Sequence, residues 1–237
     1  LSIMGAVAMM RGASQQSIDL LNRAIAGLRT TGLYQDLIAA LIRRSSVNRY
    51  LGNYGLAMED IDEALQICSL HPREEKLRAE GLRVKGVNLY LKGELRSSLV
   101  NLQESLGLYR AMRENLDAAK VQLDLGVVYY AMGNLVETET CYLASLEFWQ
   151  KTQNSLWQSN VLNNLGGLQH VRGHFEMAAQ NLERAIGYAR LAVNPRLECY
   201  SLTSLADLYR EIRAYHEAHK VYELARSIQP GLNDLTL

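Results

Sequence analysis

The stretch LNNLGGLQHVRGHFEMAAQNLERA (162–185) contains the pattern that decides the fold. Gly173 lies near its centre, with small residues seven positions before it and five and twelve positions after it, and an apolar residue nine positions after it. The same arrangement recurs at intervals of 40 or 41 residues. Such a period predicts tandem copies of one supersecondary unit. The central positions of the six copies are Gly12, Gly52, Gly93, Gly133, Gly173 and Arg213.

Small residues occupy the same three positions in every copy. One such column could arise by chance, but three columns held along the whole chain indicate a structural requirement. Helix axes approach closely only where Gly, Ala or Ser replaces a bulky side chain, which gives the columns a mechanical reason. The columns are Gly5, Ser45, Gly86, Gly126, Gly166 and Ala206 before the centre, then Ser17, Ala57, Ser98, Thr138, Ala178 and Ala218, and then Ala24, Ala64, Ser105, Ser145, Ala185 and Ala225.

Each copy is predicted to form two helices. The small and apolar positions after the centre fall on one helical face, and Leu162 and Leu165 mark a matching face before it. The central glycine ends the first helix, because it adopts the left-handed conformation at little cost. Start signals for the next copies are Asn194-Pro195, and His71-Pro72 followed by the acidic Glu74 and Glu75. No sustained alternation predicts a strand, so the fold class is all-α, with helical hairpins in tandem.

The columns resemble the tetratricopeptide repeat (TPR) over essentially the whole chain. The matches in one copy are Leu125-Gly126, Tyr129, Gly133, Tyr142 and Ser145, and those in another are Leu205-Ala206, Tyr209, Ala218, Tyr222, Ala225 and Pro230. The resemblance implies a right-handed superhelical solenoid of about six antiparallel hairpins, a single repeat domain over 1–237. The approximate copies are 1–31, 32–71, 72–112, 113–152, 153–192 and 193–232. Because the TPR period is 34, each copy has longer helices or a longer connection.

The 40-residue form looks most like the repeats of maltose-activator-like bacterial regulators of the STAND and LuxR type. It is also similar to repeats in cell-polarity adaptors, kinesin light chains and peptide-sensing bacterial regulators. The chain begins LSIMGAVAMMRG and ends soon after Pro230 without a polar capping helix. Repeat arrays need such caps for solubility, so we expect a fragment of a larger protein, with flanking repeats or self-association through its ends.

The resemblance also implies a concave groove lined by the first helix of each copy. Tyrosines in such a groove suit recognition of a peptide or helix, although they could instead pack between neighbouring first helices. Arginines there are favoured as ligand contacts because arginine is costly to bury without a partner. The family's clamp for chaperone C-termini is not expected, since its Asn is missing at Ser46 and the equivalent positions. The groove candidates are Arg49, Tyr50, Arg83, Tyr90, Tyr130, Asn163, His170, Asp207 and Arg210.

No catalytic, metal or cofactor site is predicted. His170 and His174 flank a turn and are assigned to different helices, and the run EDIDE (59–63) is interpreted as solvated. The three cysteines lie far apart, which indicates a reducing cytoplasm rather than a disulfide framework. Equal numbers of basic and acidic residues, 25 of each, argue against direct nucleic-acid or membrane binding. Trp149 and Trp157 are expected to fill the core at one connection.

The sequence therefore predicts a non-catalytic scaffold, cytoplasmic, without cofactors. Its partner is a protein or peptide segment, another domain of the parent chain, or a small effector. The favoured context is the regulatory domain of a bacterial signalling or transcription regulator. The alternative is a free-standing adaptor that bridges protein partners. An enzyme is the third alternative, and no residue supports it.

Overall fold

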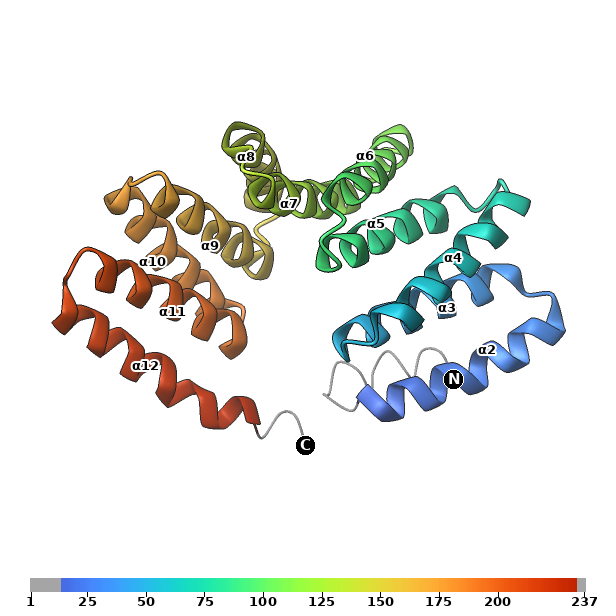
Figure 1. Ribbon diagram of the computed structural model, residues 1–237, viewed down its shortest axis with the longest axis horizontal. Coiled ribbons are helices and arrows are strands. Elements are labelled where there is room, and N and C mark those ends of the chain that lie inside the picture. The colour runs from blue at the N-terminus through green and yellow to red at the C-terminus, as the bar shows by residue number, and fades with distance from the viewer. Residues whose placement is uncertain (1–13, 234–237) are drawn as a thin grey trace. The chain divides into compact units, whose positions relative to one another are not determined.

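The computed structural model describes residues 14–233, and every regular element in that range is an α-helix (Figure 1). The positions Gly5 and Gly12 of the first copy lie outside the described residues. The all-helical fold predicted from the repeat columns is confirmed. The helices are α2 (Ser14–Thr31), α3 (Tyr34–Tyr50), α4 (Tyr54–Leu70), α5 (Glu75–Leu91), α6 (Leu95–Ala111), α7 (Asn115–Ala131), α8 (Leu135–Lys151), α9 (Ser155–Val171), α10 (Phe175–Leu191), α11 (Pro195–Glu211) and α12 (Tyr215–Asn233).

The helix lengths explain the 40-residue period. Each helix from α3 to α11 has 17 residues, and the connections have three, as at 92–94 and 112–114. Two such helices with two such connections make one period. The extra length relative to the TPR period therefore lies in the helices rather than in the connections. The one four-residue connection, 71–74, accounts for the single interval of 41.

The glycine at the centre of each copy ends the first helix, as predicted. Gly93, Gly133 and Gly173 have φ of 82°, 78° and 75°. The amide of Gly173 donates to the carbonyl of His170, and the next amide donates to the carbonyl of Gln169, which is the Schellman pattern. In the sixth copy Arg213 takes this conformation with φ of 64°. One glycine-type turn thus closes each described hairpin.

Three of the connections between copies use the same left-handed turn without a glycine, whereas the connection 32–33 has Gly32 with φ of 69°. Arg113, Gln153 and Val193 have φ of 59°, 52° and 50°, and a β-branched residue such as Val193 is strained there. Asn194 caps the following helix as predicted, because its Oδ1 accepts from the amide of Leu197 at 2.9 Å.

The helix start predicted at His71-Pro72 is wrong for the proline, but Glu74 and Glu75 lie at the start of the helix as predicted. The helix that follows, α5, begins at Glu75, and Pro72 lies within the connection itself. Glu74 stands at the N-terminal cap without a side-chain hydrogen bond. The four-residue connection, one residue longer than the other connections between α3 and α12, holds the proline before the helix begins. Pro72 therefore marks the connection before α5 and not the first residue of the helix.

The two helices of a hairpin meet most closely at the small residues seven before and five after the central position. A Cβ added to Gly86 would lie 2.6 Å from Cγ of Leu102 on the facing helix, and one added to Gly166 would lie 2.6 Å from Cγ of Leu182. The Ser98 hydroxyl donates to the carbonyl of Gly86 at 2.7 Å. At Gly86 and Gly166 a Cβ has no room, because the facing leucine occupies that space.

A second close approach lies nearer the other end of each hairpin. The hydroxyl of Ser105 on α6 donates to the carbonyl of Ala79 on α5 at 2.7 Å. In another hairpin the first helix supplies the hydroxyl, and Ser159 on α9 donates to the carbonyl of Ala185 on α10 at 2.8 Å. These four residues are fully buried. Each pair combines two small residues, and its one hydroxyl finds an acceptor on the partner helix, as a buried polar group requires.

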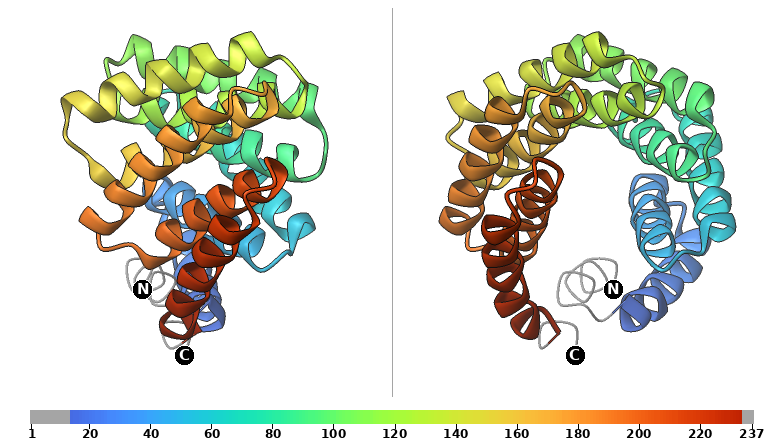
Figure 2. Two further views of the ribbon diagram at one scale, coloured as in Figure 1. Left: turned by 90° about the vertical axis from the view of Figure 1, so that its left-hand side faces the viewer. Right: turned by 60° about the vertical axis from the view of Figure 1, so that its left-hand side comes forward.

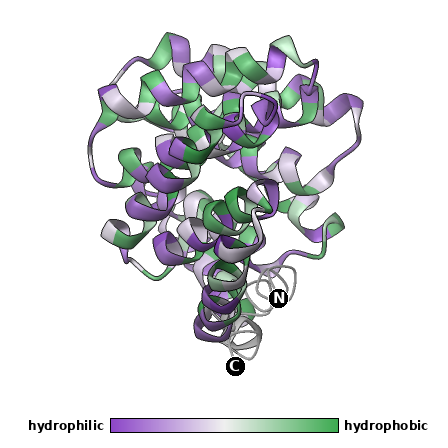
Figure 3. Ribbon diagram, turned by 90° about the vertical axis from the view of Figure 1, so that its right-hand side faces the viewer, coloured by the Kyte–Doolittle hydropathy of each residue, from purple (hydrophilic) through white to green (hydrophobic). Residues whose placement is uncertain are grey.

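The described helices form two compact units, residues 14–124 and residues 125–233, and the division lies inside α7. In unit 1, α3 packs against both α4 and α5, and in unit 2, α9 packs against both α10 and α11 (Figure 2). The core of unit 1 includes Ile38, Leu41 and Ile61, and that of unit 2 includes Leu182 and Leu205. Figure 3 shows apolar and polar residues sharing the same helices, as expected where one face is buried.

Among residues 14–233, none of the helices combines the length and the apolar composition that a bilayer crossing requires.

Two neighbouring glycines on α9 provide a matched test of the close approach. Gly166→Ala should lower the free energy of unfolding by about 1–3 kcal/mol, because the new methyl group meets Leu182. Gly167→Ala should instead raise it by about 0.5–1 kcal/mol, because its Cβ would meet no atom within 4 Å and alanine favours the helix. Denaturant unfolding measures both variants. Equal effects of the two changes would contradict the packing described.

Candidate ligand-binding surface

The groove candidates lie on the first helices of the hairpins in both units. We call the surface made by residues ten, six, three and two positions before each central turn the first-helix surface. Each unit carries its own set of candidates on this surface. Unit 1 contains Arg49 and Tyr50 on α3 with Arg83 and Tyr90 on α5, and unit 2 contains Tyr130 on α7, Asn163 and His170 on α9, and Asp207 and Arg210 on α11.

In unit 1, Arg83 forms an ion pair that the sequence analysis missed. Its Nε donates to Oδ2 of Asp124 on α7 at 2.6 Å, and both side chains are largely buried. Burial alone would lower the pKa of Arg83, but attraction to Asp124 and the hydrogen bond raise it above its ordinary value. The two residues are 41 positions apart, which places them on consecutive first helices. That spacing was the one signal in the sequence that could have paired them.

Arg49, the neighbouring cation on α3, has no such partner. It is half-buried, and among the described residues no side chain or carbonyl forms a hydrogen bond or ion pair with it. Burial lowers the pKa of Arg49; attraction by Asp124 opposes this, and repulsion by Arg83 adds to it. One carboxylate, already bonded to Arg83, therefore faces two guanidinium groups. This part of unit 1 carries an excess positive charge.

The three tyrosine candidates differ in exposure. Tyr50 is 58 % exposed and Tyr130 is 38 % exposed, so packing against neighbouring helices does not account for their surfaces. Tyr90 is half-buried, which suits either packing or ligand contact. Tyrosine offers a large apolar area and a hydroxyl at low entropic cost. Exposed tyrosines on both units thus provide contact area for a peptide.

In unit 2 two of the candidates bind to acidic residues of the same surface. His170 Nε2 lies 2.6 Å from Oε2 of Glu211, again 41 residues away on the next first helix. Arg210 donates to Oδ1 of Asp207 at 3.1 Å, and the hydroxyl of Tyr222 donates to the same oxygen at 2.6 Å. Internal pairs therefore satisfy most of the charge predicted to contact a ligand.

Asn163 is the candidate least suited to bind a ligand through its carbonyl oxygen. The residue is half-buried, and its Oδ1 is enclosed, with no hydrogen-bond partner among the described residues. An enclosed acceptor cannot reach a ligand without a change of rotamer. Its position ten before the turn is equivalent to that of Arg83, whose longer side chain reaches the next helix.

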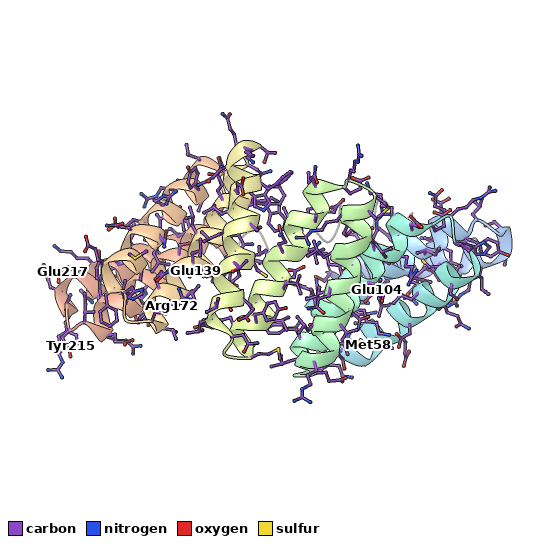
Figure 4. The ribbon with its side chains drawn as sticks, turned by 90° about the horizontal axis from the view of Figure 1, so that it is seen from above. Met58, Glu104, Glu139, Arg172, Tyr215 and Glu217 are labelled. Carbon is purple, nitrogen blue, oxygen red and sulfur yellow. The ribbon has the colours of Figure 1, made fainter. Side chains whose placement is uncertain are left out.

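Two further polar clusters lie away from the candidate residues. In unit 2, Arg172 donates through Nη1 to Oε2 of Glu139 at 2.6 Å, and Gln169 donates to the other carboxylate oxygen at 3.1 Å (Figure 4). In unit 1, the Nε of Arg44 donates to Oδ2 of Asp60 at 3.0 Å. Asp60 is buried, so the interpretation of the whole EDIDE run as solvated is wrong at this residue.

The histidines His170 and His174 stand on either side of one turn, and the thiol of Cys68 and the tryptophans Trp149 and Trp157 lie elsewhere in the chain. His170 lies in α9 and His174 stands at the cap of α10, as expected, and no group of metal-ligating side chains is found within residues 14–233. Burial raises the pKa of the Cys68 thiol to about 11, which keeps it protonated at neutral pH. Trp149 is buried and stacks on Trp157 with ring centroids 5.1 Å apart, so the predicted core position is confirmed for Trp149, whereas Trp157 is half-buried.

The geometry defines a helical-repeat protein whose first helices carry accessible polar and aromatic side chains at the candidate positions. Residues 117–190 match the tetratricopeptide repeat family, and the resemblance stated from the sequence is confirmed for that segment. The described chain as a whole has the TPR-like fold. A search of curated proteins gave no significant match.

Several solved structures share this fold at low sequence identity. BtubC from P. vanneervenii is 16 % identical with a TM-score of 0.76, and the match covers 93 % of this chain and 92 % of that one. A STAND protein with a tetratricopeptide repeat sensor from Pyrococcus horikoshii is 17 % identical with a TM-score of 0.76, covering 96 % and 35 %. A Rap protein complexed with competence and sporulation factor is 15 % identical with a TM-score of 0.74, covering 99 % and 75 %.

Asp124 pairs with Arg83 and also attracts Arg49, so removing its charge should destabilise the fold. Asp124→Asn should lower the free energy of unfolding by about 1–2 kcal/mol, because it leaves Arg83 largely buried without a carboxylate, and partial exposure limits the cost. The control is Asp62→Asn, which removes the more exposed pair with Lys85 and should cost less than about 0.5 kcal/mol. Urea unfolding compares the two. A cost for Asp124→Asn no larger than that of the control would contradict the pairing.

Proposed function

We propose that this chain is a non-catalytic scaffold whose first-helix surface binds a protein or peptide segment. The observation that carries the proposal is Arg49, a half-buried cation without a partner among the described residues, beside the exposed Tyr50. Interfaces are enriched in tyrosine and arginine, and a few such residues provide most of the binding energy. A hairpin array presents these side chains on rigid helices, which lowers the entropic cost of binding.

The proposed context is a cytoplasmic regulatory domain of a larger bacterial signalling or transcription regulator. Two structures with the same fold support it. One is a signal-transduction ATPase with a tetratricopeptide repeat sensor, of which this fold makes up about a third, and the other is a Rap protein complexed with competence and sporulation factor. In this context the partner is a peptide, another domain of the parent chain or a small effector.

A free-standing adaptor that bridges protein partners is the second candidate function. The fold that this chain shares with BtubC is the observation that favours it. The full parent sequence separates the two candidates. An upstream nucleotide-binding loop together with a DNA-binding helix-turn-helix supports the regulator, and a chain without them supports the adaptor.

Binding is tested with a library of random peptides displayed on phage and selected against the immobilised protein. Enriched peptides should bind in solution, and Tyr90→Ala should weaken that binding by roughly tenfold while changing the melting temperature little. The control is Tyr215→Ala, which removes an exposed tyrosine from the second helix α12 and should leave binding unchanged.

Two outcomes would contradict the proposal. The first is that selection enriches no peptide that binds in solution. The second is that Tyr215→Ala weakens binding as much as Tyr90→Ala does. A large loss of stability in Tyr90→Ala with unchanged peptide affinity would instead assign Tyr90 to packing.

A further inference from the structure

The position three residues before the central turn carries a basic side chain in three copies. These residues are Arg49, His170 and Arg210. Glu211 lies 2.6 Å from His170, and Asp207 accepts a hydrogen bond from Arg210 at 3.1 Å. Arg49 alone of the three has no carboxylate within ion-pair distance among the described residues. A carboxylate therefore reaches this position either from the next first helix, as Glu211 does, or from three residues earlier on the same helix, as Asp207 does. Neither kind of carboxylate is present at Arg49.

Both positions that supply an acid elsewhere carry other residues around Arg49. Asp207 precedes Arg210 by three residues, and the residue three before Arg49 is Ser46, whose hydroxyl donates to a carbonyl of its own helix. Glu211 stands two before its turn on the next first helix, and the equivalent residue on α5 is Leu91. The chain thus omits both internal acids at this one copy.

The neighbouring charges do not replace the missing acid. Asp124 is the carboxylate that attracts Arg49, but its Oδ2 already accepts from Arg83 at 2.6 Å. Asp117, the other acid near Arg83, forms its own pair with Lys120 at 2.9 Å. An arginine held half-buried beside another arginine gains most from a carboxylate that arrives from outside, because charge-assisted hydrogen bonds to arginine are strong.

Resting on the proposed function, we infer that unit 1 binds a peptide segment through an aspartate or glutamate side chain paired with Arg49. The residues next to Arg49 in sequence and in repeat position add the apolar part of the specificity. Tyr50 follows Arg49 and is 58 % exposed, and Leu91, which is equivalent on α5 to Glu211 on α11, is 46 % exposed. The occupant is therefore an acidic residue flanked by apolar or aromatic residues, and its carboxylate takes the place that Glu211 and Asp207 hold in the other copies.

The experiment uses the enriched phage peptides, synthesised with an acetylated N-terminus and an amidated C-terminus so that side chains carry their only carboxylates. Isothermal titration measures Kd for the wild-type protein and for Arg49→Gln. Both Arg49→Gln and replacement of the peptide's acid by its amide should weaken binding by roughly tenfold or more. Combined, the two changes should weaken binding little more than either alone, which is the signature of a direct pair.

The matched control is Arg96→Gln, which removes the same charge from an exposed position on the second helix α6. It should change Kd less than twofold. Arg49→Lys retains a point charge without the planar guanidinium group and should bind with intermediate affinity. Arg49→Gln removes a cation without an internal partner, so its thermal unfolding should match that of the wild type.

The inference and the proposed function fail in different ways. Peptides that bind wild type and Arg49→Gln equally would overturn the inference while leaving the scaffold function in place. Peptides that need a free C-terminal carboxylate, or whose acids are dispensable, would also overturn it. Selection that yields no binding peptide would overturn the proposed function itself.

Discussion

The structure of a hairpin depends on the close approach of its two helices at the small-residue pairs, as in α5–α6 and α9–α10. At Gly86 and Gly166 the facing leucine leaves no room for a single methyl group. Serine hydroxyls at neighbouring contacts donate to carbonyls of the opposite helix, so the polar atoms brought into the core are satisfied. The pairs fix where one helix crosses the next. The remaining features of a hairpin, including which residues face outward, follow from that crossing.

The same contact explains why so much of the fold could be predicted from the sequence. A column of glycine, alanine and serine at a constant interval records a steric requirement that every copy must satisfy, and Gly173 records the turn. The left-handed turns at Arg113, Gln153 and Val193 could not be predicted, because no glycine marks them. There the 17-residue helices and three-residue connections impose the conformation on whichever residue occupies the position.

The candidate surface was less predictable than the fold. Sequence offsets define which residues are assigned to it, but ion pairs such as Arg83 with Asp124 join different copies, and each copy carries different charges. Asp60 in the EDIDE run illustrates the same limit, since its burial depends on Arg44 from another helix. The copies keep the same kinds of residue at packing positions and differ at surface positions. Periodicity therefore predicts the packing residues but not the contacts at the surface. Arg49 stands out as a candidate ligand contact only by comparison with His170 and Arg210, which are paired with acids in their own copies.

The most direct measurement of the central claim is hydrogen–deuterium exchange of the protein with and without a selected amidated acidic peptide. If ligand binding uses the first-helix surface of unit 1, the peptide should slow exchange in the C-terminal halves of α3 and α5, around Arg49 and Tyr90. Exchange in α4 and α6 should change little. Protection confined to α4 and α6, with α3 and α5 unaffected, would contradict the account.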